Sequence, residues 1–206
     1  MRVFLMNIIS AVFHPLLMAT YSSALFYWML PEIYSPIPYK SIPMFIAVVF
    51  ITTAVIPALS IAFLMFTKRV SNLDITRREE RSLPFLTIGV FYGATTYMFY
   101  DKMNIPRPLL VMMIAVTVLI VVIFLISIKF KVSVHSAGIW GVAGLFTAVA
   151  IRYLSVDMVW PLSLIFMGAG LTTMSRLELG RHTPNESWAG IILGYTLSFS
   201  AFWFFA

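Results

Sequence analysis

Seven apolar stretches, each close to the length that crosses a membrane, occupy most of this sequence. A helix that spans the hydrocarbon layer of about 30 Å needs about 20 mainly apolar residues. The stretches cover residues 3–30, 44–67, 83–100, 109–128, 137–154, 158–174 and 187–206, with breaks expected at His14-Pro15 and at Pro57. This pattern predicts an all-α fold, a polytopic membrane helix bundle of six to seven transmembrane helices that forms a single domain over residues 1–206.

The composition supports a membrane bundle and excludes several kinds of chemistry. Charged residues make up 11% of the chain, against about 25% in soluble domains. There is no cysteine, which excludes disulfides and cysteine-based metal or nucleophile chemistry. The net charge of +6 is typical of cytoplasmic loops and lipid headgroup contacts. We therefore expect a multi-pass membrane protein, with membrane lipids and not nucleic acid as partners. A bacterial inner membrane is the expected location, although no residue pattern identifies the host membrane, and the oligomeric state stays open.

The polar stretch 175–186, between the last two apolar stretches, contains the residues best suited to chemistry. Arg176 offers a planar fork of donors that suits phosphate oxygens. His182 can act as a nucleophile when a neighbouring carboxylate fixes its tautomer, and Glu186 lies four residues on, on the same helix face. Gly180 and Pro184 indicate a break before a new helix. The alternative is a polar connector whose charges lie in water or among headgroups.

The helix count places three polar clusters on one side of the membrane. Each crossing switches sides, so loops separated by an even number of helices lie together. Two helices separate the basic segment 77–81 from His135, and two more separate His135 from the stretch 175–186. Arginines, two histidines and carboxylates are therefore expected at one membrane face. His14, a polar residue within an apolar stretch, is expected to bond the backbone freed by Pro15 and not to act in catalysis.

Two motifs resemble the signatures of a known enzyme family. Ser175-Arg176, five residues, His182, three residues and Glu186 resembles the third signature of the type 2 phosphatidic acid phosphatases, which share their core with vanadium haloperoxidases. That signature is Ser-Arg, five residues, His, three residues, Asp. The segment Val132-Ser133-Val134-His135 resembles the second signature, Pro-Ser-Gly-His, in its serine and histidine. The sequence departs from the family in having glutamate at 186 and in lacking the proline and glycine around His135.

Two segments compete for the role of the family's first signature, a lysine six residues before Arg-Pro. Segment 77–84 has several arginines before a proline, whereas segment 101–108 contains Lys102 and a literal Arg107-Pro108. The helix count puts the second segment on the opposite side of the membrane from His182. We therefore favour Arg78 and Arg81, although a helix pair then separates them from the second signature.

This preference predicts unequal effects of two substitutions. We expect Arg81→Ala to raise KM or lower kcat for a lipid phosphate far more than Arg107→Ala, because only Arg81 shares the membrane face of His182. Steady-state kinetics of both variants on one lipid phosphate measures the difference. A larger effect at Arg107 would mean that the helix count between the signatures is wrong.

The resemblance implies an integral-membrane lipid phosphatase that hydrolyses a phosphate or diphosphate monoester of a lipid through a phosphohistidine. In that family pattern His182 is the nucleophile, Glu186 orients its ring and His135 is the general acid, with no metal and no cofactor. The implied phosphate-binding residues are Arg176, Arg81, Arg78, Ser133 and Ser175.

Two other functions and the orientation stay open. One alternative is an inactive relative that binds anionic lipid headgroups or a protein partner. The other is a small transporter, which is disfavoured because both histidines are expected at loop edges and transport sites lie near the membrane midplane. The excess of Lys and Arg would put the site at the cytoplasmic face, whereas relatives usually present it at the outer face.

Overall fold

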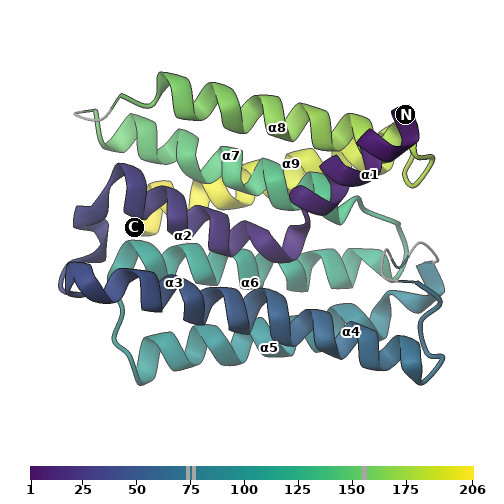
Figure 1. Ribbon diagram of the computed structural model, residues 1–206, viewed down its shortest axis with the longest axis horizontal. Helices are drawn as coiled ribbons and strands as arrows, with labels where there is room; N and C mark the ends of the chain where they lie inside the picture. The colour runs from purple at the N-terminus through teal and green to yellow at the C-terminus, as the bar shows by residue number, and fades with distance from the viewer. Residues whose placement is uncertain (73–74, 76–77, 155–156) are drawn as a thin grey trace. The chain divides into compact units, whose positions relative to one another are not determined.

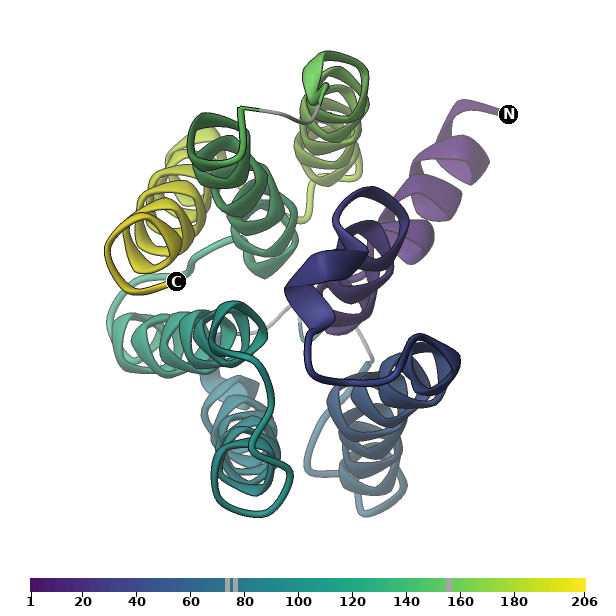
Figure 2. The same ribbon diagram turned by 90° about the vertical axis from the view of Figure 1, so that its left-hand side faces the viewer.

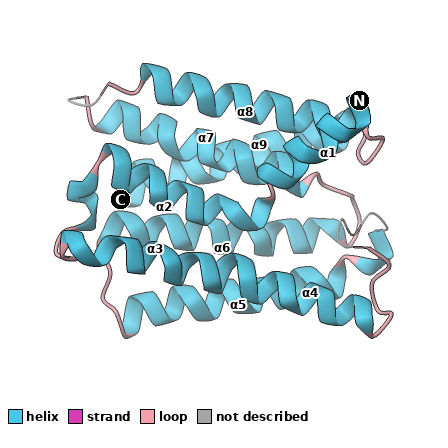
Figure 3. Cartoon of the chain, viewed as in Figure 1, coloured by secondary structure: helices cyan, strands magenta, loops and turns pink. Residues whose placement is uncertain are grey.

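The protein is helical throughout the part that the structure describes. The structure, a computed structural model, describes residues 1–72, 75, 78–154 and 157–206. These residues form helices and turns, with no β-strand among them (Figure 1, Figure 3). The α-helices are α1 (Arg2–Val12), α2 (Met18–Met29), α3 (Ile42–Phe50), α4 (Ile56–Phe66), α5 (Ser82–Asp101), α6 (Arg107–Ser127), α7 (Val134–Arg152), α8 (Val159–Glu178) and α9 (Pro184–Phe205). The predicted all-α class is confirmed.

Five helical segments in the described part are candidate membrane spans by length and composition. They cover Arg2–Met29, Tyr39–Phe66, Arg107–Ser127, Val134–Arg152 and Pro184–Phe205. Helices α5 and α8 match two further predicted stretches and have 20 residues each, but they are not among these five. The chain is therefore a helical membrane protein with five candidate spans, where the sequence predicted six to seven.

Two helix boundaries differ from the prediction and bear on the site. α7 begins at Val134 and α8 continues to Glu178, so His135 and Arg176 are helical residues. The sequence analysis placed both in polar connecting segments. This was wrong because the terminal turns of both helices contain polar residues, so the apolar stretch is shorter than the helix. The break at His14-Pro15 is confirmed: His14 has φ −67° and ψ 134°, the extended backbone that a following proline favours.

The backbone contacts divide the chain into two compact units. The first unit comprises residues 1–18 and 132–206, and the second comprises residues 19–131. The first unit therefore joins α1 to the last three helices of the chain, and it contains all three histidines and the stretch 175–186. The single domain predicted over residues 1–206 stays a prediction.

Helix α7 is the centre of the first unit. It lies between α8 and α9 (Figure 2), and α1 lies against α8. The contact of α7 with α9 is the closest because glycines remove side chains from it. A Cβ added at Gly194 would lie 2.9 Å from the carbonyl carbon of Ala137, and one at Gly144 would lie 2.9 Å from Cα of Tyr195. Small residues that let helix backbones approach are typical of membrane bundles, and the glycine-rich sequence of α7 indicated such packing.

Gly194→Ala is expected to destabilise the first unit. The added methyl group would clash with the Ala137 backbone, which cannot rotate away as a side chain can, so the helices must separate at a cost of about 1–3 kcal/mol or more. A lower thermal unfolding midpoint in detergent measures this. Gly170→Ala on α8 is the matched control, because a Cβ at Gly170 meets nothing within 4 Å. Equal midpoints for the two variants would contradict the close approach of α7 and α9.

In the second unit, Pro57 organises the second apolar stretch. Proline has no N–H for the carbonyl four residues earlier, here that of Thr53. A π-helical segment, Ile51–Val55, joins α3 to α4 just before the proline. The hydroxyl of Tyr92 on α5 donates to the carbonyl of Thr53 at 2.8 Å. The irregularity expected at Pro57 is therefore a widened helical turn, and α5 supplies the missing donor.

Candidate active site

The turn that ends α8 connects two of the predicted site residues. Gly180 has a φ of +62°, which glycine adopts without a steric penalty. Its N–H donates to the carbonyl of Leu177 and the N–H of Arg181 donates to that of Arg176, both at 3.0 Å. These two bonds are those of a Schellman motif, a common helix C-terminus. The motif ends α8 just after Arg176 and directs the chain to His182.

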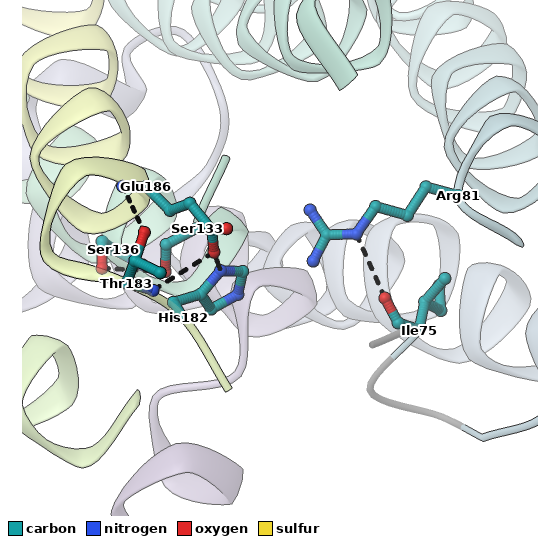
Figure 4. Close-up of polar contacts among 7 residues, drawn as sticks. All are labelled: Ile75, Arg81, Ser133, Ser136, His182, Thr183 and Glu186. Carbon is teal, nitrogen blue, oxygen red and sulfur yellow. Dashed lines mark hydrogen bonds and ion pairs between the residues drawn. The ribbon is translucent and has the colours of Figure 1, made fainter. Parts of the chain in front are cut away.

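Residues at the start of α9 fix the position of His182, which lies just before this helix. Thr183 is the N-cap: its hydroxyl oxygen accepts the N–H of Glu186 at 3.3 Å, and Oε2 of Glu186 accepts the N–H of Thr183 at 3.3 Å. Such reciprocal bonds form a capping box. The same Oε2 lies 2.7 Å from Nδ1 of His182 (Figure 4). Glu186 therefore both caps α9 and anchors the imidazole ring.

The bond to Glu186 determines which ring nitrogen of His182 can react. An ionised carboxylate only accepts hydrogen bonds, so in the neutral ring Nδ1 carries the proton and Nε2 carries the lone pair. The side chain of His182 is 3% exposed and that of Glu186 is 15% exposed. A carboxylate in this position also stabilises the imidazolium cation. The pair has the arrangement that a histidine nucleophile or base requires.

His135 lies in the first turn of α7, which is tied to α9. Ser133 caps α7 by accepting hydrogen bonds from the N–H of Ser136 at 3.4 Å and from its hydroxyl at 2.9 Å (Figure 4). The N–H of Ser133 donates to the carbonyl of Glu186 at 3.0 Å. The starts of the two helices are thus held together, and His135 interacts electrostatically with His182. Ser133 positions His135, and its predicted contact with phosphate stays a prediction.

The ring of His135 presents a nitrogen that the described residues leave without a partner. The side chain is buried and hydrogen-bonds the backbone of Ser10 on α1. Its Nε2 is also buried, and no described residue forms a hydrogen bond to it. An unsatisfied buried polar atom costs about 1–3 kcal/mol. Such an atom in the same compact unit as His182 is therefore a candidate proton donor or acceptor for a bound group.

Arg176 is fully inside the first unit. It is 1% exposed, and its Nη1 donates to the hydroxyl of Ser10 at 3.3 Å. That hydroxyl lies 2.9 Å from the hydroxyl of Ser175, which donates to the carbonyl of Thr172 at 2.7 Å. Ser175 is therefore engaged within the protein and supports Arg176 through Ser10, while its predicted contact with phosphate stays a prediction. A buried guanidinium is costly unless an anion or strong acceptors surround it.

His14 is a neighbour of the site that the sequence analysis set aside. Its ring packs edge to face with that of His135, with centroids 5.2 Å apart. Its Nδ1 accepts the N–H of Leu16 at 3.3 Å, which caps the short helical turn Pro15–Leu17 and is not a bond to the carbonyl that Pro15 leaves without a donor. The rarity of a histidine within an apolar stretch was the available signal. The proximity to His135 joins residues 121 positions apart (135 − 14), and no local pattern indicates it.

The arginines chosen for the first signature belong to the second unit. Arg81 is buried, donates through Nε to the carbonyl of Ile75 at 3.1 Å (Figure 4) and lies over the ring of Phe85 at 5.7 Å. Arg78 begins a short 3-10 turn, Arg78–Glu80, and its side chain lies outside what the structure describes. The assignment of Arg78 and Arg81 to phosphate stays a prediction.

No family model, curated protein or solved structure matches the chain. Within the described ranges, no group of three or more His, Asp or Glu side chains is placed to hold a metal ion. The first unit does contain four residues that the sequence nominated: His135 on α7, Arg176 on α8, Glu186 on α9, and His182 in the turn between α8 and α9.

Proposed function

We propose that this chain is an integral-membrane lipid phosphatase of the type 2 phosphatidic acid phosphatase family, working through a phosphohistidine. The bond between Nδ1 of His182 and Oε2 of Glu186, 2.7 Å long, carries the proposal. It gives a buried histidine a reactive Nε2 and an anionic partner for its cation. His135 and Arg176 lie in the same compact unit as this pair, and we assign them the roles of general acid and phosphate-binding cation.

In the first step, Nε2 of His182 attacks phosphorus of the lipid phosphate. The P–N bond forms while the P–O bond to the lipid breaks, and His135 gives a proton to the departing alcohol oxygen, or to the phosphate oxygen of a diphosphate. Arg176 balances the charge on the non-bridging phosphate oxygens, as preorganised cations do in other phosphoryl-transfer sites. Glu186 stabilises the positive charge that the substituted imidazole acquires.

In the second step, water attacks the phosphorus of the phosphohistidine. His135, now neutral, accepts a proton from this water as the P–O bond forms and the P–N bond breaks. Inorganic phosphate leaves and His182 regains its lone pair at Nε2. The proton that His135 gives in the first step is recovered in the second, so the two proposed steps balance.

The membrane setting supports a lipid as the phosphate ester. His135 lies in α7 and Glu186 in α9, and both helices are candidate membrane spans. A site at the ends of membrane helices meets phosphate groups that are attached to a membrane-embedded tail. The net charge of +6 favours anionic headgroups. As part of the same proposal, we propose that this membrane is a bacterial inner membrane.

Phosphate release from a panel of lipid phosphates tests the function. The purified protein in detergent micelles is incubated with a phosphatidate, a lysophosphatidate and an isoprenyl diphosphate, and inorganic phosphate is measured. Release from at least one substrate, with an acid-labile and alkali-stable phosphoryl group trapped on the protein, is expected. Binding of anionic vesicles without any release would overturn the enzyme and favour the headgroup-binding alternative.

A further inference from the structure

Ser10 is the only buried residue of α1. The other α1 residues are exposed or half-buried, and a helix that spans a membrane turns its polar residues toward the protein and its apolar ones toward lipid. Here the residue that α1 turns inward is a serine, and it is in contact with two residues of the proposed site. The packing of α1 therefore serves a polar contact more than an apolar one.

The hydroxyl of Ser10 is the central member of a chain of hydrogen bonds. Arg176 donates to it at 3.3 Å, and it donates in turn to the hydroxyl of Ser175 at 2.9 Å, because the Ser175 hydrogen is used on the carbonyl of Thr172 at 2.7 Å. A hydroxyl that donates its one hydrogen away from the arginine directs its lone pairs toward the guanidinium. This arrangement fixes the position of Nη1 of the Arg176 guanidinium.

The backbone of Ser10 contacts the other side of the site. Its carbonyl is among the last four of α1, which have no partner within the helix, because the His14-Pro15 break ends α1 at Val12. The ring of His135 contacts the Ser10 backbone, and its Nε2 has no hydrogen-bond partner among the described residues. Nε2 is thereby left as the atom that exchanges protons.

We propose that Ser10 is a positioning residue of the site, which holds the Arg176 guanidinium through its hydroxyl and the His135 ring through its carbonyl. This inference rests on the proposed function for its kinetic consequence. It assigns the N-terminal helix a role in orienting both the phosphate-binding cation and the general acid. Ser10 lies outside both motifs in the first unit that resemble family signatures.

Ser10→Ala tests the hydroxyl. With one of its acceptors lost, Arg176 is held less firmly toward the phosphate. KM for the best lipid phosphate is therefore expected to rise roughly ten- to a hundredfold, the value of one hydrogen bond to a charged group, while kcat changes less. Ser10→Thr, which keeps a hydroxyl, should restore most of the affinity. Asn7→Ala, an exposed polar position on the same helix, is the matched control.

The outcomes separate this inference from the proposed function. If the parent protein is active and KM of Ser10→Ala equals that of Asn7→Ala, Ser10 has no positioning role although the enzyme assignment stands. A different result would likewise mean a purely structural serine: kcat and the unfolding midpoint of Ser10→Ala both fall, KM is unchanged, and Ser10→Thr restores neither.

If the parent protein hydrolyses no lipid phosphate, the proposed function fails and binding of inorganic phosphate decides about Ser10. Calorimetric titration of the parent and of the same three variants is then the measurement. Phosphate binding that Ser10→Ala weakens and Ser10→Thr restores supports the positioning of Arg176 in an anion site. Binding that Ser10→Ala leaves unchanged, or no binding by the parent, overturns the inference.

Discussion

His182→Ala is expected to lower phosphate release from the accepted lipid phosphate by roughly a thousandfold or more, since removing a nucleophile leaves only what binding and charge stabilisation contribute. Covalent trapping of phosphate on the protein should disappear with it. The measurement is the initial rate at saturating substrate, together with acid-quenched labelling. Turnover above about a tenth of the parent rate would contradict the assignment of His182.

Burial of His182 demands a second variant and a control. His182 lies in the turn between α8 and α9, at a loop edge as the sequence predicted. Its side chain is nevertheless only 3% exposed, so alanine leaves a gap and deprives Glu186 of a partner. His182→Asn is similar in shape and offers an amide N–H to Glu186 without a nucleophilic nitrogen, and it should be equally inactive. Asn185→Ala, at an exposed position in the same turn, should keep the parent rate. His182→Asn and Asn185→Ala should both unfold near the midpoint of the parent protein.

The sequence predicted the local features of the site well because local chemistry determines them. Gly180 at positive φ and Pro184 in the first turn of α9 follow from what glycine and proline allow. The pairing of His182 with Glu186 follows from four-residue spacing at a helix start. In each case the residues that interact are near in sequence, so the local sequence pattern is enough to predict their arrangement.

The sequence could not predict the features that depend on packing between distant helices. Ser10 lies 166 residues from Arg176, and its contact depends on α1 lying against α8. Helix ends were also misjudged, since caps and not hydropathy end α8 beyond Arg176. Helices α5 and α8 have 20 residues each but are not among the five candidate spans in the described part, where six to seven were predicted.

The structure explains why the chain has glutamate at 186, where the family resemblance would have aspartate. Position 186 is the third residue of α9, at which a capping box requires glutamate or glutamine. The carboxylate must reach back to the N–H of Thr183 and sideways to Nδ1 of His182, at 3.3 and 2.7 Å. Aspartate is one methylene shorter and cannot make both contacts from the same backbone position. The site is therefore expected to be adapted to glutamate.

Glu186→Asp is accordingly expected to lower kcat about tenfold, although it restores the residue of the family signature. Glu186→Gln should be worse, at roughly a hundredfold or more, because glutamine keeps the cap but loses the charge and can present an N–H that favours the wrong tautomer of His182. Kinetics of both variants on one accepted lipid phosphate is the measurement. A faster Asp variant would mean a decayed site instead of an adapted one.

Stability measurements separate the two roles of Glu186. Glutamine at this position still forms a capping box, so Glu186→Gln should unfold near the parent midpoint despite its loss of activity. Thr183→Ala removes the other half of the cap and should cost about 1 kcal/mol of stability, yet it leaves the bond between Glu186 and His182 in place and should keep most of the activity. If activity instead followed stability across these variants, Glu186 would matter only as a helix cap, and His182 would lose the partner on which its reactivity is argued.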